Sequence, residues 1–264
     1  MEPHIRIQNV NKVFISGRRE VVALKDIDLE IARGQFTCLL GPSGCGKSTL
    51  LNAVAGFSPP TGGSIAVDGR PVTGPGPERG MVFQEYALFP WMTVEQNIAF
   101  GLEIKGLAKA RIGGTVEKLL HMLSLFEFRA RYPKDLSGGM RQRVAIARVL
   151  ALDAPVMLMD EPFGALDALT RRNLQDELLR IWTETKKTIL FVTHSIEEAI
   201  YLADRIVVMT YRPGTVKRDL ILDLPRLRDP ASPAFNALKR ELGHLVMEEQ
   251  QRHHNDERRM AAVD

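Results

Sequence analysis

The sequence contains no long apolar run. No stretch approaches the ~20 apolar residues that a helix needs to cross a bilayer. The longest apolar segments are Phe36–Leu40, which is short, and Val144–Leu152, which contains Arg148. The first ten residues also lack the apolar core of a secretion signal. We therefore expect a protein that is made and kept in the cytosol.

Cysteine is scarce and occurs only as Cys38 and Cys45. Their spacing fits no common metal-binding pattern, and a disulfide is not expected in a cytosolic protein. Cys38 is best interpreted as a small buried apolar residue. Cys45 has two interpretations. It is either a tolerated loop residue or a reactive thiol whose ionised form is favoured by neighbouring N–H groups and by Lys47.

A strong excess of one charge is also absent. The 35 Lys and Arg residues are scattered among 32 Asp and Glu residues, and the net charge is +3. No basic face is implied, so no nucleic-acid partner is expected. The sequence shows no internal repeat and no low-complexity linker. With 264 residues, 45% of them apolar, the chain has enough material for the core of one large domain.

Strand and helix patterns alternate along the chain, which predicts an α/β fold. Ile5–Phe14 and Val21–Ile31 alternate apolar and polar residues and predict antiparallel strands with one solvated face. Gln35–Leu40 predicts a buried strand, and Lys47–Ala55 predicts a helix. Further strands are expected at Ser64–Val67, Val156–Met159, Thr188–Thr193 and Arg205–Met209, and further helices at Leu169–Thr183 and Ser195–Leu202.

Residues from about 92 to 150 carry helical periodicity and no strand signal. The helices are expected at Val94–Leu102, Ala110–Leu125 and Met140–Leu152. We therefore expect a helical subdomain inserted into a single domain that spans residues 1–254. A last helix should carry the apolar face of Phe235 and Val246, and residues 255–264 should form a charged tail.

A phosphate-binding loop is indicated between the buried strand and the helix that follows it. Residues 41–48 match the pattern GxxxxGK[ST]. Glycines let such a loop wrap so that backbone N–H groups point at phosphate oxygens, and the helix N-terminus also favours an anion. Lys47 should reach the β- and γ-phosphates, and the Ser48 hydroxyl should bind Mg²⁺. The nucleotide-binding residues expected here are Gly41, Pro42, Ser43, Gly44, Cys45, Gly46, Lys47, Ser48 and Thr49.

Two carboxylates follow the apolar run Val156–Met159. A buried strand can deliver acidic side chains to the edge of a sheet, beside a phosphate-binding loop. Asp160 should hold the Mg²⁺ ion, and Glu161 should polarise the attacking water. The pattern is weak alone and gains weight because a phosphate-binding loop precedes it.

A second anion-binding helix start is indicated at Leu136-Ser137-Gly138-Gly139-Met140. Ser137 can cap a helix that begins near Gly139, and the two glycines expose backbone N–H groups. Here the sequence resembles the ABC ATPase family, whose signature motif is LSGGQ. The residues that follow, 141–148, are also similar to that family. Met140 departs from the signature glutamine, which suggests that this side chain is not essential.

The resemblance covers about residues 4–225 and assigns further roles. Gln84 resembles the family's glutamine that senses Mg²⁺ and the γ-phosphate, Asp167 the aspartate of the D-loop, and His194 the switch histidine. Phe14 stands where an aromatic residue stacks on adenine. It replaces a more frequent tyrosine and keeps the π face. The fold implied is a P-loop NTPase core with an antiparallel β subdomain and an inserted α-helical subdomain.

The resemblance also implies a homodimer. The phosphate-binding loop of one subunit would face Ser137, Gly138 and Gly139 of the other, with two ATP molecules between them. Hydrolysis would weaken this contact and let the dimer open. Asp167 would link the two sites, and His194 would stabilise the γ-phosphate and orient water.

Three segments resemble the nitrate/sulfonate/taurine importer group: Leu88–Val94, Arg212–Thr215 and Leu224–Arg226. This implies an ATPase at the cytoplasmic face of the cell membrane that drives an integral membrane permease and, through it, an extracytoplasmic substrate-binding protein. The alternative is a soluble ABC ATPase in DNA repair or translation, although no second cassette, coiled coil or zinc module is visible. A GTPase is a weaker option, because the guanine motif NKxD is absent.

Large apolar side chains cluster around a proline between Gln84 and Thr93. Two interpretations remain open for this coupling segment, residues 85–92. It is either core packing between two lobes or a groove that receives a short helix from the permease.

Overall fold

The computed structural model describes residues 2–17 and 19–261. It divides into two compact units. The first unit contains Met1–Gly76 and Thr188–Asp264, and the second contains Pro77–Lys187. Each unit carries part of the expected chemistry, and each is described by itself.

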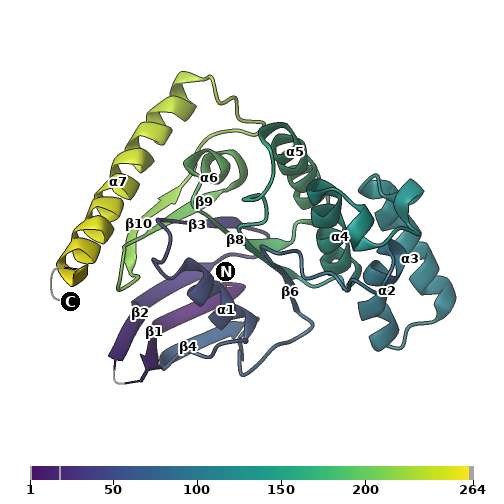
Figure 1. The fold of residues 1–264 in the computed structure, drawn as a ribbon, viewed down its shortest axis with the longest axis horizontal. Coiled ribbons are helices and arrows are strands. Elements are labelled where there is room, and N and C mark those ends of the chain that lie inside the picture. Colours follow the sequence, from purple (N-terminus) through teal and green to yellow (C-terminus); the bar gives the residue numbers. More distant parts are fainter. Residues whose placement is uncertain (1, 18, 262–264) are drawn as a thin grey trace. The chain divides into compact units, whose positions relative to one another are not determined.

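The first unit contains an antiparallel sheet (Figure 1). Its strands, in the order β2-β1-β4-β5, are β2 (Arg19–Ile31), β1 (Ile5–Ser16), β4 (Gly62–Val67) and β5 (Arg70–Pro71). Ile5 pairs with Ile31 and Ile7 with Leu29, and all four side chains are buried. Val10, Leu24 and Ile27 are also buried, whereas polar residues between the buried positions, such as Gln8 and Glu30, are exposed, so the predicted pair of half-buried antiparallel strands is confirmed.

The first unit also contains a parallel core. Its elements are β3 (Phe36–Leu40), β8 (Thr188–Thr193), β9 (Arg205–Met209), β10 (Val216–Ile221), α1 (Lys47–Ala55) and α6 (Ile196–Leu202). Strand β3 lies between β8 and β9 and is parallel to both, and all its residues are buried. Strand β10 is antiparallel to β9 and was not expected, because none of its residues is buried and its apolar pattern is correspondingly weak.

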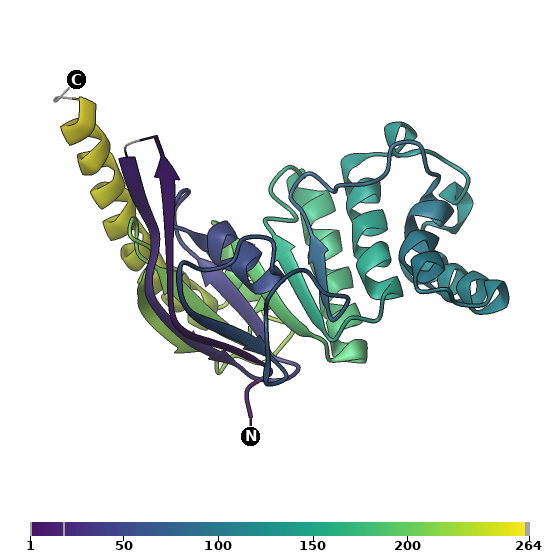
Figure 2. The ribbon, with the colours of Figure 1, turned by 90° about the horizontal axis from the view of Figure 1, so that it is seen from below.

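The C-terminal helix α7 runs from Pro233 to Ala261. Phe235, Leu242 and Val246 are buried and form the expected apolar face. The helix continues through most of the segment that was expected to be a charged tail, and residues 262–264 lie outside the described residues. Figure 2 shows this helix in yellow, running to the C-terminus.

The second unit pairs two parallel strands, β6 (Arg79–Val82) and β7 (Val156–Asp160). Its helices are α2 (Val94–Ile104), α3 (Lys109–Met122), α4 (Gly138–Ala151) and α5 (Ala168–Thr185), with short 3-10 turns at Phe126–Phe128 and Pro133–Asp135. Helix α3 ends earlier than expected because Ser124 has a left-handed φ of 53°. Helix α2 contacts both α3 and α4 (Figure 2).

The expected fold class is confirmed: the chain is α/β with an antiparallel sheet, a parallel sheet that carries the glycine-rich loop, and a helical region. Residues 92–150, all of which the structure describes, contain helices and turns and no strand. The boundaries of a separate helical subdomain remain a prediction, since the compact unit Pro77–Lys187 is wider than the expected insert. Among the described helices, none has the length and apolar character that crossing a membrane requires.

Candidate functional site

The glycine-rich loop connects β3 to α1 in the first unit. Gly46 precedes the first helical residue with a φ of 98°, a conformation that favours glycine. A Cβ atom at Gly46 would lie 2.8 Å from Leu24 Cδ2 and 2.9 Å from the Ala23 carbonyl oxygen. No side chain caps α1, so its N-terminal N–H groups face the loop without a side-chain acceptor from the cap residue. The loop therefore has the backbone geometry that anion binding requires.

The Lys47 side chain is folded into this loop and is only 4% exposed. Its Nζ atom donates hydrogen bonds to the carbonyl oxygens of Gly41 (2.8 Å) and Pro42 (2.9 Å). These bonds keep the side chain ordered and place a positive charge within the loop. A buried ammonium group at the N-terminus of a helix is suited to bind phosphate.

Cys45 is fully buried in the same loop. Burial raises the pKa of its thiol, and Lys47, although only 3.8 Å from the sulfur, offsets this only in part. The hypothesis that Cys45 is a reactive thiolate is therefore wrong. The structure gives it a packing role, because a Cβ atom at Gly41 would lie 2.8 Å from its Sγ atom.

His194 lies beside the glycine-rich loop along the sheet edge. Strands β3 and β8 are parallel neighbours, and Leu40 pairs with Thr193. Gly41 and His194 therefore leave the carboxyl ends of adjacent strands, where ligands of α/β sheets bind. The His194 side chain is exposed. Its backbone position is fixed by Thr193, whose hydroxyl donates to Glu198 Oε2 at 2.6 Å and accepts from the Ser195 N–H at 2.9 Å.

The loop that contains Arg212 and Gly214 packs against the glycine-rich loop, and its sequence predicted no role at the site. Arg212 Nε donates to the Gly44 carbonyl oxygen at 3.3 Å. Gly214 packs so closely that a Cβ atom there would lie 2.3 Å from the Cys45 carbonyl oxygen. The Arg-Pro-Gly turn sequence was visible, but no local signal connects it to a loop about 170 residues earlier.

Two carboxylates and Gln84 lie at the carboxyl ends of neighbouring strands in the second unit. Strands β6 and β7 are parallel, and Val82 pairs with Met159. Asp160 is the last residue of β7, and Gln84 and Glu161 follow the ends of the two neighbouring strands. Glu161 has a left-handed φ of 40°, which is rare for a residue with a side chain and is typical of functional sites.

Ser137 begins α4 as its N-cap, as the sequence predicted. Its Oγ atom accepts a hydrogen bond from the Met140 N–H at 3.3 Å. A Cβ atom at Gly139 would lie 2.6 Å from Thr170 Cγ2, and one at Gly138 would lie 3.3 Å from the Tyr86 hydroxyl. Close packing therefore favours glycine at position 139 and leaves little room for a side chain at 138, and both glycines also expose N–H groups at the helix start.

Asp167 is the N-cap of α5. Its carboxylate accepts from the Thr170 N–H at 3.0 Å, and this bond holds the pKa of the Asp167 carboxyl below its usual value. The side chain is exposed. It has a structural role within its own chain, beside any role that it has toward a second subunit.

Phe14 is 44% exposed near the end of β1. The Lys12 ammonium lies 5.1 Å from the centroid of its ring. An exposed aromatic face with a neighbouring cation is suited to stacking on a base. Its contact with adenine remains a prediction.

The oxygen donors expected to bind Mg²⁺ suit an ion that is bound together with phosphate. Among the described residues, no group of three or more His, Cys, Asp or Glu side chains could hold a metal alone. Mg²⁺ normally keeps several waters and binds through one or two carboxylates plus substrate phosphates. The oxygen donors of Ser48, Gln84 and Asp160 suit that role as complements to phosphate oxygens. The structure thus presents two constellations: the loop with His194 in the first unit, and Gln84, the two carboxylates and the signature glycines in the second.

Comparison with known proteins gives a consistent result. A family model described as ABC transporter matches residues 24–164. The chain is 49% identical over 238 residues to the nitrate import ATP-binding protein NrtD of Synechocystis, covering 90% of each chain. It is 47% identical over 256 residues to the taurine import ATP-binding protein TauB of Roseobacter denitrificans, covering 93% of this chain and 96% of that one.

Solved structures agree with this. A dimeric ATP-binding cassette in a post-hydrolysis state, bound to ADP and phosphate, is 32% identical with a TM-score of 0.74, covering 84% of this chain and all of that one. The predicted resemblance to ABC ATPases, and to nitrate and taurine import subunits among them, is confirmed. The glycine-rich loop, the signature helix and these relatives show that the chain belongs to the ABC transporter family.

Proposed function

We propose that this chain is the ATP-binding and ATP-hydrolysing subunit of an ABC importer. It would couple hydrolysis to the passage of a small anion such as nitrate, a sulfonate or taurine through a separate permease. The observation that carries this proposal is the buried Lys47 ammonium within a glycine-rich loop at the start of α1. The relatives support the substrate class, because two of them are named for the import of nitrate and taurine.

The nucleotide would be bound mainly by the first unit. The N–H groups of residues 41–48 and the Lys47 ammonium would bind the phosphates, and Phe14 would stack on adenine. Ser48, Asp160 and Gln84 would hold Mg²⁺, whose charge neutralises the phosphate oxygens. Glu161 would accept a proton from the attacking water, and His194 would orient that water toward the γ-phosphate.

The catalytic assembly would be a homodimer. Ser137, Gly138 and Gly139 would present the N-terminus of α4 to the nucleotide held by the partner subunit. Asp167, at the start of α5, would contact the opposite site. The dimeric state of the solved cassette bound to ADP and phosphate supports this arrangement.

The permease would contact the coupling segment. Asn97 is fully buried and fixes this segment through hydrogen bonds with the backbone of Phe89 and Met92. The Phe89 ring packs on Phe100 at 4.5 Å, whereas Trp91 is 69% exposed. An exposed tryptophan on a rigid turn favours the interpretation as a docking surface over core packing for this side chain.

The remaining partners follow from the same function. The subunit would lie peripherally at the cytoplasmic face of the cell membrane, and an extracytoplasmic substrate-binding protein would deliver the anion to the permease. No nucleic acid would take part. The alternative, a soluble ABC ATPase of DNA repair or translation, would need neither of these membrane partners.

Inspection of the neighbouring reading frames for a permease, followed by co-expression of that permease with this chain, tests the proposal. The importer reading predicts that the chain sediments with membranes only when the permease is present, and that vesicles then take up nitrate, taurine or a sulfonate on addition of ATP. The matched control is the Lys47→Ala variant, which should assemble but not drive uptake. A chain that never associates with the permease would favour the soluble alternative.

A further inference from the structure

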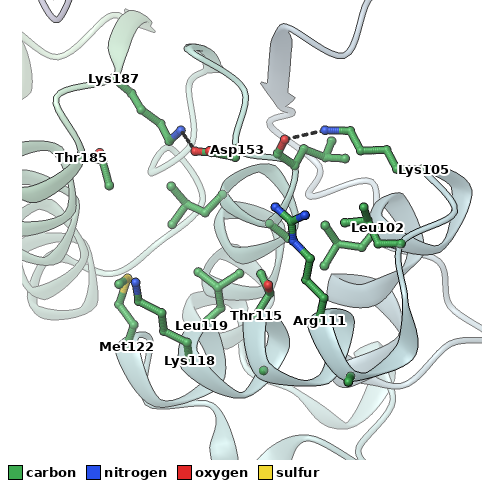
Figure 3. Close-up of a pocket in the computed structure, with 16 residues that line it drawn as sticks. Leu102, Lys105, Arg111, Thr115, Lys118, Leu119, Met122, Asp153, Thr185 and Lys187 are labelled. Atoms are coloured by element: carbon green, nitrogen blue, oxygen red, sulfur yellow. Dashed lines mark hydrogen bonds and ion pairs between the residues drawn. The ribbon is translucent and has the colours of Figure 1, made fainter.

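A cavity lies within the second unit and is formed by residues that the proposed function does not use. Its volume is about 760 Å³, within the range of small-molecule binding sites. It is bounded by one face of α3, the carboxyl ends of α2, α4 and α5, and the loops that follow these helices (Figure 3).

The floor of this cavity is apolar. Leu102, Leu119 and Leu150 line it and are buried. Leu107 and Leu152 also line it and are partly exposed. These side chains come from α2, α3, α4 and two loops, so the floor is continuous across several elements. A continuous aliphatic floor suits the aliphatic body of a ligand.

The rim is cationic. It carries Lys105, Arg111, Lys118 and Lys187, whereas its one carboxylate, Asp153, accepts a hydrogen bond from Lys187 at 2.8 Å. Lys105 donates to the neutral carbonyl oxygen of Leu152 at 2.7 Å. Figure 3 shows the Arg111 side chain rising from α3 into the cavity, with Lys118 from the same helix beside Met122. Three cations, Lys105, Arg111 and Lys118, are therefore without a carboxylate partner in the described part of the chain.

Capping of α4 explains only part of this charge. Lys105 binds the carbonyl oxygen of Leu152, the C-cap of α4, and Lys187 binds that of Ala154 just beyond it, where the helix dipole favours cations. Arg111 and Lys118 bind no carbonyl group there. They stand seven residues apart on the cavity face of α3, so they flank the cavity along its length.

Gly114 supports a ligand site on grounds other than charge, because it keeps the cavity open. It lies in the interior of α3, where glycine is among the least favourable residues. A Cβ atom at this position would meet nothing within 4 Å, so packing does not require glycine. Gly114 lines the cavity, and the lack of a side chain keeps the space between Arg111 and Lys118 open.

We propose that this cavity binds an amphipathic organic anion. Its aliphatic body would lie on the leucine floor, and its carboxylate, sulfonate or phosphate group would lie among Lys105, Arg111 and Lys118. The ligand would join α3 to the carboxyl end of α4, whose amino end is Ser137. The proposal is independent of the proposed function, since none of these cavity residues belongs to the nucleotide-binding constellations.

Calorimetry with decanesulfonate, below its micelle concentration, tests the proposal. The intact chain should bind this anion at one site, and decyltrimethylammonium, which has the same tail and the opposite charge, at least about tenfold more weakly. The double variant Arg111→Gln, Lys118→Gln should weaken decanesulfonate binding by about tenfold or more. Lys109→Gln changes an exposed cation of the same helix outside the cavity and should bind as the wild type does.

Gly114→Leu provides a test that does not depend on charge. Leucine favours a helix more than glycine does, so α3 should remain folded while the side chain fills the cavity. Decanesulfonate binding should be lost, with an unchanged circular dichroism spectrum. Equal binding of both amphiphiles, or unchanged binding in both the double variant and Gly114→Leu, would overturn the proposal. Sedimentation with anionic lipid vesicles identifies the source of the ligand. If the chain pellets with the vesicles and these variants reduce the pelleting, the ligand is a lipid headgroup. If the chain binds decanesulfonate but does not pellet with the vesicles, the ligand is a free anion.

Discussion

The Arg148 guanidinium donates to the carbonyl oxygen of Ala87 at 2.7 Å. This bond ties the signature helix α4 to the segment that follows Gln84. Tyr86 and Ala87 both have left-handed backbone conformations, with φ of 62° and 47°, which residues with side chains rarely adopt. Burial lowers the pKa of Arg148, so this cation is held in a partly desolvated position. The contact keeps a strained turn in place between the two motifs.

Arg148→Met should therefore destabilise the chain by about 1–3 kcal/mol, because the carbonyl groups of Ala87 and Tyr86 lose a charged donor. Arg148→Lys should recover part of the loss through one bond. Urea unfolding measures the change, and Lys109→Met, which alters an exposed cation, should show almost none. If Arg148→Met and Lys109→Met unfold alike, the contact does not stabilise the turn.

Trp91→Ser should lower transport far more than the basal ATPase activity of the isolated subunit. The side chain is largely exposed, so its loss should not open the core, while the permease should lose an aromatic anchor. Uptake in vesicles and ATP hydrolysis by the purified subunit are measured on the same variant. Parallel loss of both activities, or unfolding, would show that the segment serves packing instead.

Lys47→Ala should remove most nucleotide binding, because the phosphates lose a buried cation and the loop carbonyls of Gly41 and Pro42 lose their donor. Equilibrium binding of a fluorescent ATP analogue measures the loss, which should reach about 100-fold. Lys25→Ala, an exposed lysine of β2, serves as the control. Binding within twofold of the wild type would contradict the assigned role of Lys47.

Cys45 should react slowly with iodoacetamide in the folded chain. Burial raises the pKa of its thiol, so at pH 8 a smaller fraction is thiolate than in the unfolded chain, whose thiols have a pKa of about 8.5. Burial also raises the pKa of Cys38. The alkylation rate should therefore increase when guanidinium chloride unfolds the protein. Because the folded pKa is the higher one, the thiol stabilises the fold below the unfolded pKa, and this contribution is lost as pH rises. Rapid labelling of Cys45 in the native chain would restore the reactive-thiol hypothesis.

Local motifs made much of the site predictable. The spacing from Gly41 to Ser48 and the cap at Ser137 depend on residues that are adjacent in sequence, so the loop, α1 and α4 could be placed. The partners of Gly44 could not, because Arg212 approaches from a distant turn and only the folded chain brings it there. The thiolate hypothesis for Cys45 failed for a similar reason: sequence showed the nearby Lys47 but not the complete burial of the sulfur. The left-handed backbone of Glu161 carries no sequence signal either.

The most direct test of the account is the Glu161→Gln variant. The amide keeps the size of the side chain but cannot take a proton from water, so ATP should bind while hydrolysis falls by about 100-fold or more. Size-exclusion chromatography with Mg-ATP should then show a stable dimer, whereas Glu127→Gln, at an exposed carboxylate of a 3-10 turn, should elute as the wild type does. A strictly monomeric Glu161→Gln variant with wild-type turnover would contradict the assignment of an ATP-driven dimer.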